Sequence, residues 1–210
     1  MWLFKWRAII DHFKQMNGYI AFGCILFFAG MIVGGTNPAF KAFLDGQLAG
    51  LGELTSIIDQ SSNPTLTMIL VIFLNNAIKS IFVMYLGALF GIMPFIFLVV
   101  NGMLIGYLLK HVAELQGAGV VTELIFKGLL PHGILEIPAI IVACAYGMRF
   151  GALTFRGLGA VLFSKSRLSA VGKEYEAFVV RTVPVMVILT ITLLVASVIE
   201  STITVWLLAM

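Results

Sequence analysis

Five long apolar stretches constrain the fold of this chain more than any other feature of its sequence. Each holds about 18 or more mostly apolar residues, enough for an α-helix to cross the hydrocarbon core of a bilayer. Only 11% of the 210 residues are charged, whereas a soluble domain carries roughly twice that share. The stretches are also continuous, without the alternation of β-barrel strands. We therefore predict one all-α, polytopic membrane helix bundle with five transmembrane helices, at about 18–36, 66–86, 89–111, 132–150 and 182–208.

Length alone separates the second of these helices from the third. A single helix over residues 66–112 would be about 70 Å long, more than twice the thickness of the hydrocarbon core. Gly87, Gly91 and Pro94 fall inside this stretch and disfavour a continuous helix. We place the break between the two helices there.

Four further segments are predicted to be helical without crossing the membrane. Residues 1–16 form a basic amphipathic helix at the cytoplasmic interface, and residues 39–60 form an interfacial helix on the outer side. Residues 120–130 are too short to cross and are expected to be a re-entrant or interfacial half-helix before the fourth span. Residues 152–181 form a cytoplasmic amphipathic segment continuous with the last span. The apolar side of the first helix comprises Trp2, Trp6, Ile9, Ile10 and Phe13.

The distribution of basic residues predicts the orientation of the chain. With the N-terminus inside, three basic residues fall in outer segments: Lys41, Lys110 and Lys127. Nine fall in inner segments: Lys5, Arg7, Lys14, Arg149, Arg156, Lys165, Arg167, Lys173 and Arg181. This imbalance follows the positive-inside rule. We expect a multi-pass protein of the cell membrane, with its N-terminus in the cytoplasm and its C-terminus outside.

Gly-x-x-x-Gly occurs five times, which points to close helix packing. In lipid, small residues one turn apart let two helix backbones approach each other. Such faces support either homo-oligomers or packing within one chain, and so many copies favour packing within the chain. The pairs are Gly30/Gly34, Gly46/Gly50, Gly87/Gly91, Gly102/Gly106 and Gly147/Gly151.

Seven polar or charged residues fall within or at the ends of the predicted spans, and each needs a partner in the membrane. They are Asn75, Asn76, Lys79, Asn101, His132, Glu136 and Glu200. At a rise of 1.5 Å per residue, most of them reach the outer half of the bilayer, from four helices. Lys79 is the only cation within a span. We expect it to neutralise Glu136 or Glu200.

The segment around His132 is the candidate functional motif. Pro131, Gly133 and Pro138 interrupt the helix there, and His132 and Glu136 lie four residues apart on one helix face. One interpretation is a hydrogen bond that secures the broken helix end. The other is a proton-titrating or lipid-headgroup-binding site that faces the outer side. The residues alone do not separate the two.

Enzyme and cofactor functions have little support in the sequence. No His-Glu-x-x-His helix, Gly-x-Ser-x-Gly nucleophile or glycine-rich phosphate loop is present, so we predict no catalytic residues and no cofactor. His132 and Glu136 without a further nearby His or Cys make a weak metal site, and no metal is predicted. Cys24 and Cys144 are interpreted as core residues. The expected partner is the lipid bilayer, and no nucleic acid is expected.

Several of these motifs together resemble the stage II sporulation protein M family, in particular its wider integral membrane branch. They are Asn75-Asn76, Asn101-Gly102…Gly106, Leu130-Pro-His-Gly-Ile-Leu-Glu-Ile-Pro-Ala139, Gly147…Gly151 and the final Ile199-Glu200. The founding member of that family supports a complex with two partner proteins that degrade peptidoglycan. The resemblance therefore implies a non-catalytic scaffold for envelope proteins or cell-wall hydrolases. The alternative is a transporter or lipid flippase or scramblase that uses His132 and Glu136.

Overall fold

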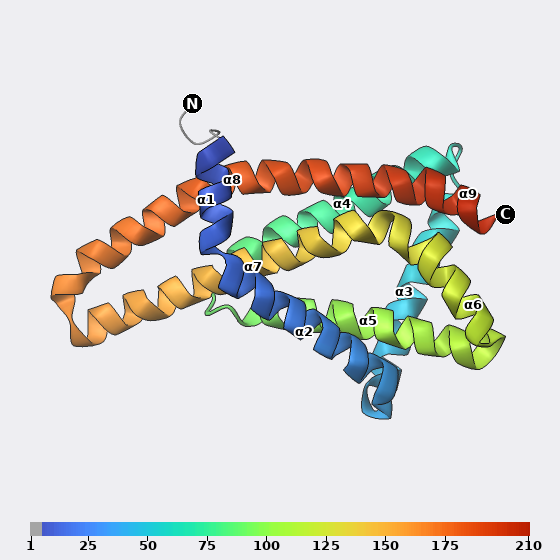
Figure 1. The fold of residues 1–210 in the computed structure, drawn as a ribbon, viewed down its shortest axis with the longest axis horizontal. Coiled ribbons are helices and arrows are strands. Elements are labelled where there is room, and N and C mark those ends of the chain that lie inside the picture. The colour runs from blue at the N-terminus through green and yellow to red at the C-terminus, as the bar shows by residue number, and fades with distance from the viewer. Residues whose placement is uncertain (1–5) are drawn as a thin grey trace.

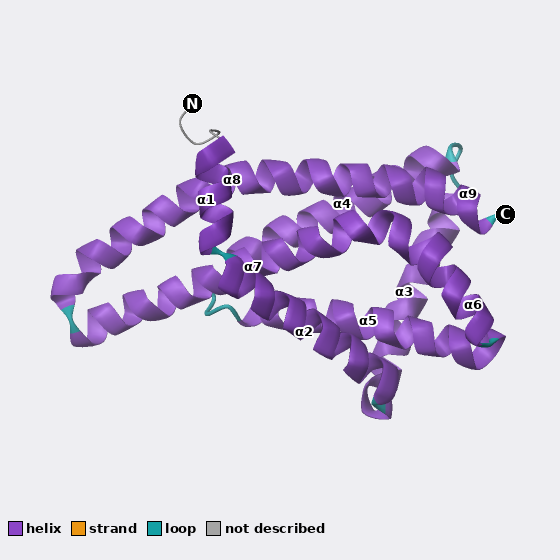
Figure 2. Ribbon diagram, in the orientation of Figure 1, coloured by secondary structure: helices purple, strands orange, loops and turns teal. Residues whose placement is uncertain are grey.

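The computed structural model describes residues 6–210, and within them the chain is almost entirely helical and contains no β-strand (Figures 1 and 2). The predicted membrane-facing Trp2 lies outside the described residues. In chain order the helices are α1 Trp6–Gln15, α2 Asn17–Thr36, α3 Lys41–Asp59, α4 Pro64–Leu86, α5 Ile92–Gln116, α6 Ala118–Glu123, α7 Leu130–Phe163, α8 Leu168–Ile199 and α9 Val205–Leu208. Two π-helical segments, Leu124–Leu129 and Glu200–Thr204, follow α6 and α8.

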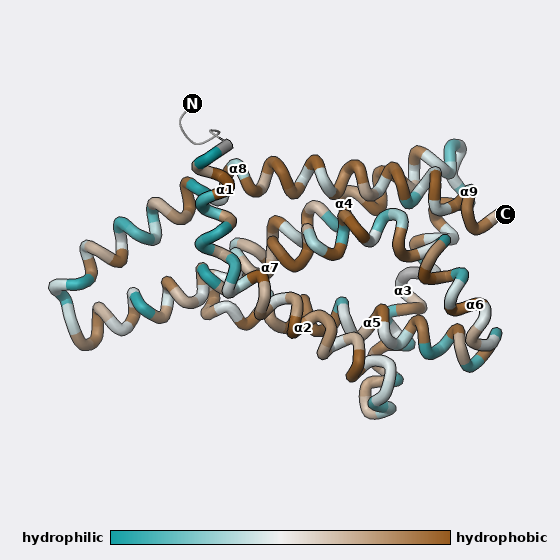
Figure 3. The backbone as a smooth tube through the Cα atoms, viewed as in Figure 1, coloured by the Kyte–Doolittle hydropathy of each residue, from teal (hydrophilic) through white to brown (hydrophobic). Residues whose placement is uncertain are grey.

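Within residues 6–210, five helical stretches are long and apolar enough to cross a membrane. They comprise α2, α4, α5, the run from α6 to α7 and the run that contains α8. Large apolar side chains such as Ile32 and Phe82 are 67% and 63% exposed, as expected of a surface that contacts lipid. Figure 3 shows the apolar residues gathered along the middle of the bundle. The prediction of an all-α, polytopic membrane protein is confirmed.

The two predicted interfacial helices lie at opposite ends of the bundle. In Figure 1 the long helices run roughly horizontally, whereas α1 crosses them near one end and α3 crosses them near the other. The C-terminus and α6 lie at the end where α3 crosses. Helix α3 is joined to the bundle through Leu44, which is fully buried and packs with Met103 and Tyr107 of α5.

Helices α7 and α8 are longer than a membrane is thick, and they form a hairpin that extends past α1 (Figure 1). Their 34 and 32 residues correspond to about 50 Å each, against about 30 Å of hydrocarbon. The predicted segment 152–181 is therefore not one helix leading into the last span. Its first part continues α7 to Phe163 and its remainder begins α8, with an ion pair between Arg156 and Glu174 (2.9 Å) joining the two arms.

The predicted half-helix at 120–130 is not a separate element, since α6, the π-helical segment Leu124–Leu129 and α7 form one helical run of 46 residues. The run bends before α7 (Figure 1). Pro131 is the second residue of α7 and lies inside this continuous run, where it removes a backbone hydrogen bond and disfavours a straight helix. Pro138 lies inside α7 without ending it. The motif therefore bends the helix instead of breaking it into two elements.

Four of the five Gly-x-x-x-Gly pairs pack within the chain. A Cβ atom on Gly34 of α2 would overlap the carbonyl oxygen of Met103 in α5, and one on Gly106 of α5 would overlap that of Met31 in α2. Gly87 and Gly147 show the same backbone contact between α4 and α7. The remaining close contacts involve Gly30, Gly91, Gly102 and Gly151. Gly46 and Gly50 of α3 have no neighbour within 4 Å of such an atom, so their pair alone stays open to another chain.

Candidate functional site

All seven polar residues singled out from the sequence line one cavity of about 390 Å³. Asn75, Asn76 and Lys79 come from α4, and Asn101 comes from α5. His132 and Glu136 come from α7, and Glu200 begins the π-helical segment after α8. Gln47 and Leu54 of α3 also contribute to the lining, because α3 crosses this end of the bundle. The convergence that depth along each helix predicts is thus present in the structure.

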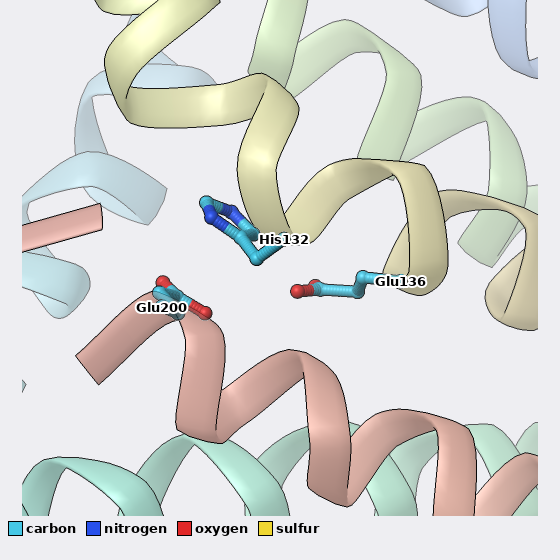
Figure 4. Close-up of side chains that lie close together, drawn as sticks. All are labelled: His132, Glu136 and Glu200. Atoms are coloured by element: carbon cyan, nitrogen blue, oxygen red, sulfur yellow. The ribbon is translucent and has the colours of Figure 1, made fainter. Parts of the chain in front are cut away.

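Three of these side chains come especially close together. One donor atom each of His132, Glu136 and Glu200 lies within 4.8 Å of the other two. Figure 4 shows the three side chains meeting from α7 and from the end of α8. We call them the His–Glu–Glu cluster. His132 and Glu136 share a face because they are one helical turn apart, whereas Glu200 reaches them only through the packing of α8 beside α7.

Short polar contacts orient some members of the site. The Asn75 amide donates to the side-chain oxygen of Asn76 (3.1 Å), and the Asn76 side chain in turn hydrogen-bonds the Glu136 carboxylate. His132 Nδ1 lies 3.4 Å from the Thr204 hydroxyl, and the Asn101 amide donates to the Phe97 carbonyl oxygen (2.7 Å). Asn75 and Asn76 therefore form a short chain of amides that ends at one of the two carboxylates.

The predicted ion pair of Lys79 is not formed. Lys79 lines the same cavity, but among residues 6–210 it makes no ion pair within 4.0 Å of Glu136 or Glu200. Its side chain is exposed on α4, where a long aliphatic stem lets the ammonium group reach away from apolar surroundings. Glu136 and Glu200 consequently share the cavity without a cationic partner in the described residues.

A second cavity meets the first at the His–Glu–Glu cluster. It has a volume of about 300 Å³, and both His132 and Glu200 contribute to its wall together with Thr204. The rest of this wall is mainly apolar and comes from α5, the π-helical segment before α7 and α9. The two cavities share His132 and Glu200 in their walls, so the cluster borders both of them.

The two π-helical segments adjoin this cluster, which the sequence did not reveal. Leu124–Leu129 ends three residues before His132, and Glu200 is the first residue of Glu200–Thr204. Such wide turns leave backbone groups imperfectly paired and occur often at functional sites. Gly133 is buried, but a Cβ atom there would meet the Ile137 and Leu129 side chains at ordinary contact distances of 3.5 and 3.9 Å. The bend is therefore associated with the π-helical segment and Pro131 more than with Gly133.

Ser80 is a further member of the site that sequence reasoning missed. It lines the 390 Å³ cavity, is only 1% exposed, and its hydroxyl has no hydrogen-bond partner within the described part of the chain. A buried hydroxyl without a partner is costly. It lies one residue after Lys79 and one turn after Asn76 on α4, which is the only signal in the sequence that could have identified it.

A second buried polar group lies where α1 meets the bundle. The His12 ring packs edge-on against Tyr146 of α7 and Phe178 of α8, at centroid distances of 5.3 and 5.7 Å. Burial, together with the nearby charges of Arg181 and Arg149, lowers the pKa of His12 to about 4. His12 is thus neutral at physiological pH and anchors α1, a role that the sequence pattern assigned to apolar residues alone.

Comparison with known proteins gives one result. No curated protein and no solved structure is similar enough to this chain to count as a match. The sequence profile described as "Stage II sporulation protein M" matches residues 19–205. That range includes α4, α5, α7 and α8, and with them all seven polar residues of the cavity. The chain therefore belongs to the stage II sporulation protein M family.

Proposed function

We propose that this protein binds a small cation in its intramembrane cavity and carries it across the membrane. The observation that carries the proposal is the pair Glu136 and Glu200 in one cavity, where neither carboxylate forms an ion pair within 4.0 Å among the described residues. Placing a carboxylate within a membrane span costs about 2.5–3.5 kcal/mol of insertion free energy unless the carboxylate is paired or neutralised. A cation that enters the cavity supplies the missing positive charge.

The shape of the site supports transport over simple structural pairing. A dry cluster with every hydrogen bond made would favour a structural role, whereas this cluster lies between cavities of about 390 and 300 Å³. Cavities of this size have room for an ion and several water molecules, since one water takes about 30 Å³. They offer less support for a lipid flippase or scramblase, which must also accommodate acyl chains. The cavity therefore favours transport, whereas the family resemblance alone favours a scaffold.

We also propose that the protein resides in the cell membrane with its N-terminus in the cytoplasm. The support is the clustering of basic residues: α1 and the α7–α8 hairpin carry most of them and lie at the same end of the bundle. The cavity then lies in the outer half of the membrane, beneath α3. No catalytic activity is part of this proposal.

The test is charge movement in reconstituted vesicles. Solid-supported membrane electrophysiology detects displaced charge for whichever cation is supplied, so H⁺, Na⁺, K⁺ and Mn²⁺ can be compared on one preparation. We expect the wild type to give a current with at least one of them and the Glu136→Gln/Glu200→Gln variant to lose it. Glu176→Gln is the matched control, because Glu176 is exposed on α8 far from the cavity lining. Equal currents in the wild type and the double variant would refute transport through this site.

A scaffold for envelope proteins is the second candidate, and the α7–α8 hairpin is the observation that favours it. The hairpin extends past α1 and exposes Lys165, Arg167 and Lys173. These are features of a surface for partner proteins, such as proteins that recruit cell-wall hydrolases. Photocrosslinking from Phe163, which is 87% exposed at the tip, should then capture envelope proteins in native membranes. Repeated recovery of this chain alone would count against the scaffold.

A further inference from the structure

The His–Glu–Glu cluster has the composition and spacing of a metal site, although no metal was expected from the sequence. We propose that His132, Glu136 and Glu200 bind a divalent first-row transition-metal ion. This inference deepens the proposed function, since it names the cation. The sequence offered only His132 and Glu136, two ligands on one helix, and the third comes from a residue more than 60 positions away that the packing of α8 brings to them.

The spacing of the three donor atoms fits a metal with little adjustment. With bonds of 2.0–2.2 Å to nitrogen and oxygen, three donors on one ion lie at most about 3.8 Å from one another. Here all three lie within 4.8 Å of one another. A contraction of these separations by about 1 Å therefore closes the site, and rotation about the terminal bonds of a glutamate supplies that readily.

The types of donor determine the class of ion. One imidazole with two carboxylates is a mixed nitrogen and oxygen set, which suits ions such as Mn²⁺, Fe²⁺ and Zn²⁺ more than purely oxygen-seeking Ca²⁺ or Mg²⁺. Soft ions that need thiolate are not matched, because neither Cys24 nor Cys144 lines the cavity. Two carboxylates and one neutral imidazole also balance the charge of a divalent ion, as an apolar environment requires.

The surroundings of the cluster resemble the outer shell of a metal site. Thr204 lies beside Nδ1 of His132 at 3.4 Å, which leaves Nε2 free to bind the ion. Asn76 hydrogen-bonds Glu136 and so orients one carboxylate. Ser80, whose buried hydroxyl has no partner in the described residues, faces the same cavity. It can hydrogen-bond a water molecule that completes the coordination of the ion, and that gives the hydroxyl the partner it lacks.

The experiment measures metal binding by the purified full chain in detergent, without any requirement for transport. After removal of metals by a chelator, the protein is titrated with Mn²⁺, and the free ion is followed by electron paramagnetic resonance. We expect saturable binding of about one ion per chain. Glu200→Gln and Glu136→Gln should each weaken binding by tenfold or more, since even residues outside the ligand shell contribute about 10–100-fold. Glu176→Gln should bind as the wild type does.

A spectroscopic measurement tests the ligand set itself. Pulsed electron paramagnetic resonance of the bound Mn²⁺ should show coupling to one imidazole nitrogen, and His132→Asn should remove it. His111→Asn is the control, because His111 lies on α5 and stacks on Tyr107 outside the cavity. Gel filtration shows whether each variant is folded. If one variant does not fold, the stoichiometry of Mn²⁺ binding by the wild type still tests the proposal.

Two outcomes would overturn the metal proposal: no saturable site in folded wild-type protein, or a site that Glu200→Gln leaves unchanged. The fate of the transport proposal is separate. Metal binding at the cluster without any cation current would leave the metal site standing and refute transport. A current with H⁺ or Na⁺ that needs Glu136 and Glu200, with no metal bound, would refute the metal site and leave transport standing.

Discussion

Replacing Gly34 by alanine is the sharpest test of how the bundle is held together. Gly34 lies where α2 and α5 cross so closely that a Cβ atom would overlap the backbone of Met103. The obstacle is a carbonyl group and not a flexible side chain, so the two helices must move apart to admit a methyl group. The same separation loosens the neighbouring contacts of Gly30 and Gly106.

The magnitude follows from two opposing effects. Forcing an additional methyl group into a well-packed interface costs about 1–3 kcal/mol. Alanine also forms helix more readily than glycine, by about 0.8–1.0 kcal/mol, which offsets part of that cost. We therefore expect Gly34→Ala to lower the free energy of unfolding by up to about 2 kcal/mol.

Gly46→Ala is the matched control, because Gly46 is also inside a helix and also belongs to a Gly-x-x-x-Gly pair. A Cβ atom there meets nothing within 4 Å. Only the helix-propensity effect remains, so this variant should be more stable than the wild type by up to about 1 kcal/mol. The assay is reversible denaturant unfolding in one detergent, followed by circular dichroism. The reasoning is refuted if Gly34→Ala is as stable as Gly46→Ala, or if Gly46→Ala is the more destabilising of the two.

Two other substitutions test how the interfacial helices dock. Leu44→Ala should destabilise the attachment of α3 by about 2–5 kcal/mol, because Leu44 is fully buried. Ile57→Ala should cost little, because the Ile57 side chain is 59% exposed. Limited proteolysis within α3 compares the two variants. For His12, the pKa of about 4 in the folded protein lies below the ordinary value of 6.5. The unfolded chain therefore binds more protons, and the stability that His12 contributes is complete above about pH 6.5 and is lost as the pH falls toward 4. His12→Phe should remove this part of the pH dependence, and thermal unfolding at pH 7 and 4.5 measures it; an identical pH dependence in both proteins would contradict the assignment.

The membrane-spanning helices were predictable because their signal is local. A run of apolar residues must satisfy its backbone hydrogen bonds internally once it lies in lipid, and a helix does so whatever its neighbours are. The break between α4 and α5 was equally local: Phe90 and Gly91 have positive φ angles of 61° and 72°, and glycine adopts that conformation without strain. The bend before α7 was harder to predict from the sequence, because a proline motif alone does not distinguish a bent helix from a broken one.

The candidate site was predictable in outline but not in chemistry. Depth along each helix brought Asn75, Asn101, His132 and Glu200 to a common level, since a helix rises by a constant amount per residue. The depth of a residue along its helix does not determine how the helix is rotated or which residues lie next to it. The expected pairing of Lys79 with a carboxylate was therefore wrong, and Glu200 was not recognised as a partner of His132 and Glu136.

The sequence by itself determined that this chain is an α-helical membrane protein of its family, with five spans and a few costly polar groups inside them. Tertiary structure decided which helix faces which. In lipid there is little hydrophobic drive between helices, so pairing depends on the fit of particular backbone surfaces. Gly34 against Met103 is one such fit. Fits of this kind, and not any local pattern, bring Glu200 to His132 and dock His12 of α1 against Tyr146 and Phe178.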